Sequence, residues 1–334
     1  MRKSGGERWI RTTVPEGSDL QSDAFSRSAI SPQGQALDLE QPVPSVTAKP
    51  ALPLRHLYLG PMRPSHRGMK QDRPRRQDAA RFMPGNERPK PPSWVHLYGL
   101  HAVCAALENP DRRPGTLFFD QKKEDSLRLV LEPILERHHN PPPLQATSAQ
   151  HMGTLVPDGA PHQGVVLKTR PLESADFKAV CARLDAEPGL VVVLDQVTDP
   201  QNVGAIIRSA VAFGAQAIVT TDRNAPFETG ALSRAAVGGV DRLPWTRVTN
   251  LAEALHMLAD SGAVLMGLDG SEGAEDIFVP PKRRRVLVLG AEGKGLREKT
   301  RDTVDVLMRL PTDPDFPHLN VSAAAAAAMM MLRV

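Results

Sequence analysis

The sequence predicts an α/β protein whose C-terminal part is built on a parallel sheet and is preceded by a smaller α/β domain. Strand-like and helix-like segments alternate from residue 190 to the end of the chain, as in a parallel sheet covered by helices on both faces. The run Gly189–Leu194 is continuously apolar, which is typical of a strand buried on both faces. Residues 1–93, in contrast, contain no sustained apolar period. We therefore expect two folded domains behind an N-terminal tail.

The tail is rich in Pro, Ser, Gln, Arg and Gly and cannot bury enough apolar surface to offset its ordering entropy, so we expect residues 1–93 to be disordered. Residues 62–91 hold nine Lys/Arg and three Asp/Glu, although the whole chain has a net charge of only +3. Such a segment suits attraction to a polyanion, or is simply a solvated tail. The opening residues 2–32 also resemble translated non-coding sequence. A start at Met69 is an alternative that N-terminal mass spectrometry would decide.

Residues 94–168 are expected to form the small α/β domain. Apolar patterning predicts strands and helices here. The expected strands are Val95–Tyr98, Thr116–Phe119 and Val165–Leu167, and the expected helices are Leu100–Leu107 and Leu127–His138, the latter kinked at Pro133. Residues 169–189 are expected to be a linker that contains a helix at Ser174–Leu184.

Residues 190–334 are expected to form the parallel-sheet domain. After Gly189–Leu194, the predicted strands are Ala217–Thr220, Ala263–Leu268, Arg285–Leu289 and Val304–Leu310. The predicted helices are Val203–Phe213, Thr229–Ala236, Leu251–Leu258 and one that begins near Ser322.

Composition excludes several classes of protein. Aromatic residues make up 4% of the chain, too few for a platform that stacks single-stranded bases. Cys104 and Cys181 form no CxxC pair, so we expect a reducing, cytoplasmic location without disulfides or a metal site. No apolar run reaches the roughly 18–20 residues that span a membrane, and the N-terminus lacks the apolar region of a secretory signal.

The first motif is the segment Asp199–Ala210, which follows the buried strand. Pro200 and Asn202 indicate a turn, and Asn202 is expected to be the N-cap of the next helix. Arg208 lies six residues further on, and we expect it in roughly the same sector of that helix. A guanidinium there suits phosphate or ribose oxygens, unless Arg208 is an ordinary surface residue.

The second motif is the segment Val288–Leu296, in which three glycines within six residues follow a strand. It does not match the dinucleotide fingerprint G-x-G-x-x-G, because Glu292 stands where a pyrophosphate needs backbone access and no negative charge. The sequence after Leu194 lacks that fingerprint too, which argues against a nucleotide-dependent oxidoreductase. An ordinary strand-to-helix turn is the simpler alternative.

The third motif is the segment Leu310–Ala328, where a Pro-rich loop leads into a helix. Asn320 or Ser322 is expected to cap this helix, and the six alanines Ala323–Ala328 permit another backbone to pack closely. The alanines could instead serve only as strong helix formers.

In this order and spacing, the three motifs resemble those of the SpoU (TrmH-type) branch of the SPOUT RNA methyltransferases, over Leu190–Val334. Upstream, Tyr98–Val103 and His162–Val165 resemble the small L30e-like RNA-binding domain. That domain precedes the catalytic one in bacterial enzymes that methylate a guanosine ribose of 23S ribosomal RNA. Residues 1–93 lie outside the resemblance.

The resemblance implies a parallel sheet with a deep trefoil knot, a homodimer, and transfer of a methyl group from S-adenosylmethionine to a ribose 2′-hydroxyl of RNA. It assigns the catalytic positions to Asn202, Arg208, Glu292 and Asn320. It places the cofactor against Gly290, Leu310 and Leu319, with Thr220 and Gly267 as further contacts.

In the expected reaction, the main task of the protein is to align the ribose hydroxyl with the methyl group, and few acid–base groups are needed. Arg208 is expected near that hydroxyl; because arginine resists deprotonation, we expect it to orient the hydroxyl and the adjacent phosphate. The sequence departs from the family at His318, where a serine is usual; histidine could relay a proton or be a neutral replacement. Transfer RNA is the alternative substrate, and a catalytically silent RNA-binding protein is the alternative class.

Overall fold

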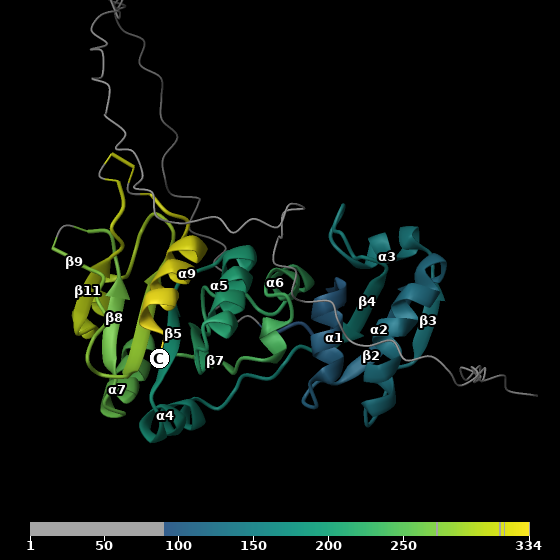
Figure 1. Ribbon diagram of the computed structural model, residues 1–334, viewed down its shortest axis with the longest axis horizontal. Helices are drawn as coiled ribbons and strands as arrows, with labels where there is room; N and C mark the ends of the chain where they lie inside the picture. The colour runs from purple at the N-terminus through teal and green to yellow at the C-terminus, as the bar shows by residue number, and fades with distance from the viewer. Residues whose placement is uncertain (1–89, 272, 314, 317, 334) are drawn as a thin grey trace, which may run out of the picture. The chain divides into compact units, whose positions relative to one another are not determined.

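The computed structural model describes residues 90–334 except residues 272, 314, 317 and 334 (Figure 1). The described residues belong to one unit of the chain. The expected disorder of residues 1–93 falls almost wholly outside the described residues, as do the basic segment up to residue 89 and the alternative start at Met69.

The small domain, which we define as β1 to β4, is built on a four-stranded mixed sheet in the order β1-β4-β2-β3. β4 pairs antiparallel with β1 and β2, and β3 pairs parallel with β2. Helices α1 and α2 cover one face of this sheet, and α3 contributes Met152 to a smaller cluster with Phe118 and Val166. The elements are β1 Val95–Tyr98, α1 Leu100–Glu108, β2 Pro114–Asp120, the 3-10 helix η1 Gln121–Lys123, α2 Glu124–Arg137, β3 Leu144–Thr147, α3 Ala149–Leu155 and β4 Val165–Thr169.

The large domain, which we define as β5 to α9, is built on a seven-stranded sheet in which every described strand pair is parallel, as predicted. Its order is β7-β6-β5-β10-β8-β11-β9, so that β10 lies between two strands that precede it in the chain. The strands are β5 Gly189–Asp195, β6 Ala217–Thr221, β7 Trp245–Val248, β8 Val264–Leu268, β9 Glu275–Asp276, β10 Arg284–Gly290 and β11 Val306–Arg309.

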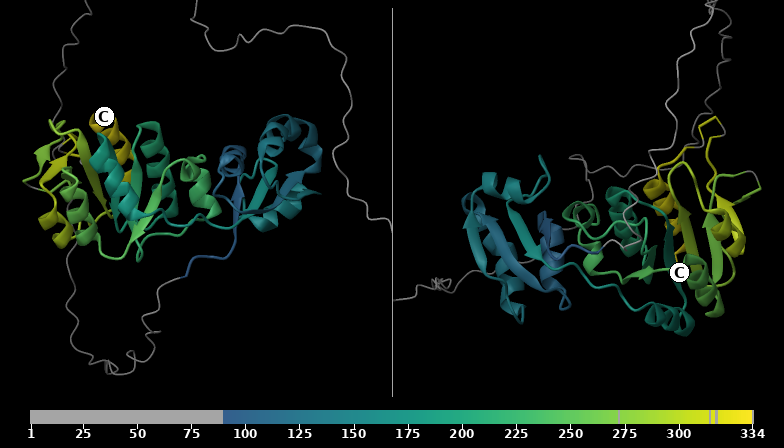
Figure 2. Two further views of the ribbon diagram at one scale, coloured as in Figure 1. Left: turned by 90° about the horizontal axis from the view of Figure 1, so that it is seen from below. Right: turned by 180° about the vertical axis from the view of Figure 1, so that it is seen from behind.

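Helices cover both faces of the large sheet because the middle of each central strand is a continuous apolar run. Along β5, Val192 and Leu194 pack with α5 and α9, whereas Val191 and Val193 pack with α4 and α7. Figures 1 and 2 show α5 and α9 side by side on the first face. The helices are α4 Phe177–Ala186, α5 Pro200–Ala212, α6 Gly230–Ala235, α7 Leu251–Asp260, α8 Glu298–Thr303 and α9 Val321–Leu332, with the 3-10 helix η2 at Gly239–Asp241.

One capping prediction was wrong. Asp199, not Asn202, is the N-cap of α5: its side chain accepts a hydrogen bond from the Gln201 amide, and Pro200 occupies the first helical turn. Proline there is pre-shaped for the helix, so the helix begins earlier than expected and Asn202 lies inside it. At α9, in contrast, Asn320 is the cap, since its side chain accepts from the Ser322 amide.

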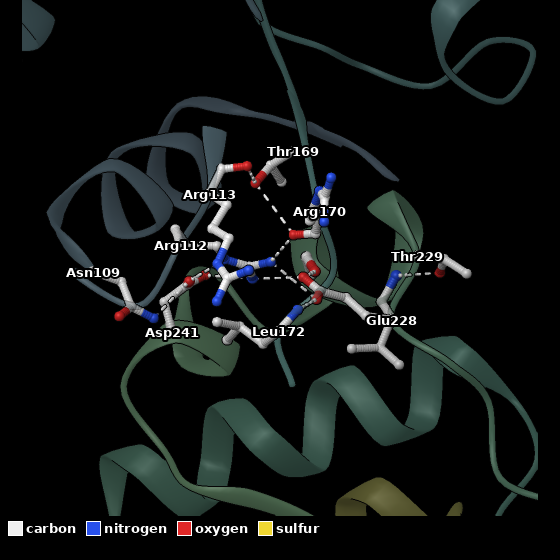
Figure 3. A network of polar contacts seen from close by, with 11 residues as sticks. Asn109, Arg112, Arg113, Thr169, Arg170, Leu172, Glu228, Thr229 and Asp241 are labelled. Carbon is white, nitrogen blue, oxygen red and sulfur yellow. Dashed lines mark hydrogen bonds and ion pairs between the residues drawn. The ribbon is translucent and has the colours of Figure 1, made fainter. Parts of the chain in front are cut away.

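A buried cluster of charges joins the small and large domains (Figure 3). Arg112, on the turn between α1 and β2, donates to Glu228 at 2.6 and 3.0 Å and to Asp241 at 2.6 and 3.1 Å. The three side chains are at most 4% exposed. Burial raises the pKa of Asp241, even though hydrogen bonds from Arg112 and Asn109 and the charge of Arg112 oppose that rise. Glu228 also accepts from Ser233 and from the Leu172 amide, so the cluster is fully hydrogen-bonded.

Candidate active site

The candidate site lies at the edge of the large sheet where its parallel strands end. Asp195 ends β5, Gly290 ends β10, and Leu268 ends β8, with Gly290 paired to Asp195 and Leu289 paired to Leu268. Open α/β sheets bind ligands outside the carboxyl ends of their strands, where the strand order changes direction. The insertion of β10 between β5 and β8 creates such a point.

Hydrogen bonds join one residue from each of the three sequence motifs at this edge. Glu292 accepts from the amide nitrogens of Asn202 and Asn320, each at 2.8 Å. The Asn320 amide also donates to the Asn202 side-chain oxygen at 3.1 Å. Asn202 is 7% exposed, whereas Glu292 and Asn320 are exposed. The resulting cluster offers one carboxylate held by two amides and open to solvent.

Ser322 fixes the orientation of Asn320. Its backbone amide and its hydroxyl both donate to the Asn320 side-chain oxygen, at 2.8 and 2.6 Å. The Asn320 amide nitrogen is therefore turned toward Glu292, so the helix cap and the cluster depend on the same side chain. Any ligand contact made by Asn320 is thereby coupled to the start of α9.

The structure does not place Arg208 with this cluster. Arg208 is exposed and makes no polar contact with the residues the structure describes, whereas Asn202 is buried. Six residues turn an α-helix by about 600°, which is about 120° short of two turns. The expectation that Asn202 and Arg208 share one sector of the helix was therefore wrong. Arg208 therefore lies about 240° around the helix from Asn202, and within the described residues its side chain makes no hydrogen bond to the cluster.

The glycine at 290 is required by the close return of the following loop. A Cβ atom there would lie 2.2 Å from the carbonyl carbon of Gly295. The loop closes on itself through two backbone hydrogen bonds between Ala291 and Gly295, and Gly293 and Gly295 have positive φ angles. Only glycine fits these positions without strain. The loop that carries Glu292 therefore packs closely against the end of β10.

Two buried aspartates that sequence reasoning missed hold the segment after this loop. Asp195 is fully buried and accepts from Arg297 at 2.6 Å and from the Thr300 hydroxyl at 2.7 Å. Asp269 accepts from Arg301 at 2.7–3.0 Å. Burial alone would raise the pKa of Asp269, but hydrogen bonds from Arg301 and Ser271 outweigh it and lower that pKa. The sequence signal that could have identified these two aspartates is their position, since each directly follows the apolar run of a strand.

The other residues expected at the cofactor have mixed surroundings. Thr220 is fully buried and its hydroxyl accepts from the Trp245 indole at 2.9 Å. Gly267 is buried, and a Cβ atom there would lie 2.7 Å from the Leu296 side chain, so this glycine makes room for packing beneath the loop. Leu310 is half-buried, and Leu319 is 50% exposed.

The residues at this edge fit S-adenosylmethionine. The side chains of Leu319 and Phe316 are 50% and 70% exposed and would offer apolar surface to an adenine ring. Glu292 would offer a negative charge to the cationic part of the molecule, and the close approach at Gly290 brings backbone groups to the strand ends. His318 is exposed, with its ring 6.1 Å from that of Phe316 on the same loop. Within the described residues, no group of three His, Cys, Asp or Glu could hold a metal ion, and no helix could cross a membrane.

A parallel sheet with a polar cluster and a glycine loop at its carboxyl edge defines a ligand-binding α/β protein, and comparisons with known proteins specify the kind. A model of the SpoU rRNA methylase family matches residues 189–330. A second model, described as RNA 2′-O ribose methyltransferase substrate binding, matches residues 96–175.

Among characterised relatives, the chain is 35% identical over 243 residues to the 23S rRNA (guanosine-2′-O-)-methyltransferase RlmB of Vibrio cholerae, covering 70% of this chain and 94% of that protein. It is 36% identical over 239 residues to the same enzyme of Escherichia coli, covering 70% and 95%. The chain therefore belongs to the SpoU family, and it is an RNA methyltransferase that uses S-adenosylmethionine.

Solved structures share the fold. The SpoU methyltransferase AviRb of Streptomyces viridochromogenes, in complex with its cofactor, superposes with a TM-score of 0.60 at 22% identity over 71% of this chain and 88% of that one. An rRNA methyltransferase of Sinorhizobium meliloti superposes with a TM-score of 0.56 over 72% and 86%. The α/β fold expected from the sequence is thereby confirmed.

Proposed function

We propose that this enzyme methylates the ribose 2′-hydroxyl of a guanosine in 23S ribosomal RNA. The cluster of Asn202, Glu292 and Asn320 at the sheet edge carries the proposal, because it unites the three motifs at one point. The relatives that act on 23S rRNA supply the substrate. Residues 94–168 would hold the RNA and residues 190–334 would carry the chemistry, joined by residues 169–189.

In this proposal the cofactor lies against Gly290, Leu310 and Leu319, with Thr220 and Gly267 supporting the strands beneath. S-adenosylmethionine supplies an activated methyl group. The chain then has to place the ribose oxygen in line with that methyl group and to exclude competing geometries, which is where alignment lowers the barrier most. Glu292, held by two amides, fixes the shape of the site and supplies its negative charge.

Arg208 is proposed to orient the ribose hydroxyl and the neighbouring phosphate, since its five donors match phosphate oxygens. Because Arg208 is exposed and makes no hydrogen bond to the cluster of its own chain, we propose that it serves the site of a second copy in a homodimer. The exposed side chains of Met330, Met331 and Leu319, on α9 and the loop before it, suit such a contact. We also propose the trefoil knot of the family and a cytosolic location.

Ribose-methylation mapping of total RNA from a deletion strain tests the substrate. Loss of methylation at one 23S position supports the proposal. Loss at a transfer RNA position instead would assign the alternative substrate, and no loss at all would point to a silent RNA-binding protein.

Methylation of 23S rRNA by purified Arg208→Ala enzyme tests the role of Arg208. We expect methylation to be abolished while binding of S-adenosylmethionine survives. Turnover near that of the wild type would refute the role. Mixing Arg208→Ala with Glu292→Ala chains tests the shared site: heterodimers regain one intact site only if Arg208 acts across the dimer.

A further inference from the structure

A basic cavity lies at one end of the small sheet. Trp94 precedes β1, Arg113 precedes β2, and Arg170 follows β4; since β4 runs antiparallel to both other strands, the three residues gather at the same end. Helix α2 packs beside β2 and ends at Arg137, and residues 137–140 reach this end as well. Segments far apart in the sequence thus meet around one hollow.

The cavity has a volume of about 910 Å³, within the range of ligand sites. Its walls include Trp94, Arg113, Arg137, His138, His139 and Arg170. One carboxylate lines the cavity, that of Glu108, and it lies 3.8 Å from Arg242. Arg112 also lines the cavity, but Glu228 and Asp241 neutralise its charge. The field inside the cavity is therefore set by the arginines at 113, 137 and 170.

Two of these arginines have no carboxylate partner among the described residues. Arg137 donates one hydrogen bond, from Nε to the Pro133 carbonyl at 2.9 Å, which leaves its outer nitrogens open. Arg170 lies with its guanidinium carbon 5.6 Å from the centre of the Trp94 ring, and Lys168 lies 5.0 Å from the same centre. Trp94 itself is 42% exposed and packs over Gly115. The exposed indole of Trp94 thus lies close to the cations of Lys168 and Arg170, and an aromatic ring attracts a cation without neutralising its charge.

The opposite end of the small sheet is occupied by contacts within the protein. Gln163 accepts from the Leu100 amide at 2.9 Å, and Arg234 of α6 donates to the Pro161 carbonyl at 3.3 Å. Gly230, the first residue of α6, approaches β1 so closely that a Cβ atom there would lie 2.1 Å from the His96 carbonyl oxygen. At the end that holds the basic cavity, Arg112 is buried, whereas Arg113, Arg137 and Arg170 are exposed.

We propose that this cavity binds phosphates of the RNA backbone, with Arg137 and Arg170 as the principal contacts. Arginine suits phosphate because its planar donors can engage two oxygens at once. Unpaired cations held on an aromatic ring are ready for a polyanion, and their neutralisation by RNA releases counterions. The proposal rests on the proposed function only in its choice of RNA as the polyanion.

The test compares the double variant Arg137→Gln/Arg170→Gln with a matched control, Lys178→Gln/Arg183→Gln, which removes two exposed charges from α4, a helix that packs on the large sheet. The probe is an in vitro transcript of Escherichia coli 23S rRNA, and its affinity is measured by filter binding between 0.05 and 0.5 M salt, roughly the range over which counterion release is read. Folding is checked by thermal denaturation, and binding of S-adenosylmethionine is measured separately.

Each phosphate contact contributes about 0.7 to the slope of log affinity against log salt for single-stranded RNA. Loss of two contacts should flatten the slope by about 1.4 and weaken binding at 0.1 M salt about 25-fold. The control should keep the wild-type slope within about 0.3, and both variants should bind the cofactor as the wild type does.

A double variant that binds the transcript like the wild type would overturn the inference, and so would a control that loses as much slope as the double variant. The assay needs no methyl transfer. The enzyme could modify no position of 23S rRNA while the double variant still showed a flatter salt dependence of binding. In that case the proposed function would fail, but the proposal that the cavity binds RNA phosphates would stand.

Discussion

Replacement of Arg112 by methionine should destabilise the protein strongly, because Arg112 is the cation that balances two buried carboxylates. The guanidinium makes four hydrogen bonds to Glu228 and Asp241, and it is 0% exposed. Methionine has a similar length and no charge. The variant would therefore leave two carboxylates facing each other where water cannot reach them.

The size of the effect follows from this burial. Removal of one partner from a buried ion pair costs about 3–5 kcal/mol, since the remaining charge is left without compensation. Here two charges remain, so we expect the upper part of that range. Total folding free energies are about 5–15 kcal/mol, so the loss is a large share of the stability. Arg113 is the matched control: its side chain is 69% exposed and 3.8 Å from Glu173, and Arg113→Met should change stability by less than about 0.5 kcal/mol.

Urea unfolding of the two variants and the wild type at pH 7 measures the difference. A second measurement at pH 5 tests the cause. Burial already raises the pKa of Asp241 in the folded protein above its unfolded value, so this group lowers stability as pH rises above about 4. Without Arg112 the pKa of Asp241 should rise further. The loss of folding stability in Arg112→Met should therefore be smaller at pH 5 than at pH 7, because a carboxylate can take up a proton at pH 5. Equal stabilities of the Arg112 and Arg113 variants, or a deficit that does not depend on pH, would refute the reasoning.

Three further predictions concern the site and a half-buried thiol. Gly290→Ala should weaken cofactor binding and cost about 1–3 kcal/mol of stability, because its Cβ would overlap Gly295, whereas Gly270→Ala, with open space around it, should change neither quantity in calorimetry. Glu292→Gln should lower kcat about 100-fold with an unchanged melting temperature, and a rate within threefold of the wild type would rule out a role for that charge. Burial, with a smaller contribution from Glu108, raises the pKa of Cys104 to about 11. At pH 8 roughly one thiol in a thousand is ionised, so iodoacetamide should label Cys104 far more slowly in the folded protein than in guanidinium, as read by peptide mapping; equal rates would contradict this.

The strands of the large domain were readily predicted because burial on both faces requires an apolar residue at every position. The run Gly189–Leu194 matches β5 within one residue, and Arg285–Leu289 lies inside β10. The elements that were missed are short or half-exposed. β3 has no fully buried residue, and helix α8 buries only Thr300, so neither carries a readable apolar period.

Local rules also misjudged two positions of the first motif. Asn202 was expected to cap its helix, but Asp199 and Pro200 together start the helix three residues earlier. Asn202 lies inside the helix, where its amide donates to Glu292, and Arg208, about 240° around the helix from it, is exposed. The rotation of about 100° per residue, rather than the number of turns, decides which face each side chain takes.

The sequence by itself determined the alternation of strands and helices, the three motifs, and, through their resemblance to a known family, the reaction. These depend on residue type and local spacing. Only the tertiary structure decided which side chains meet. Glu292 reaches Asn202 across 90 positions, Arg112 reaches its two carboxylates across 116 and 129, and Asp195 holds Arg297 across 102. Such contacts arise because β10 inserts between β5 and β8 and because loops gather at the ends of sheets, and no local pattern records where a distant segment will pack.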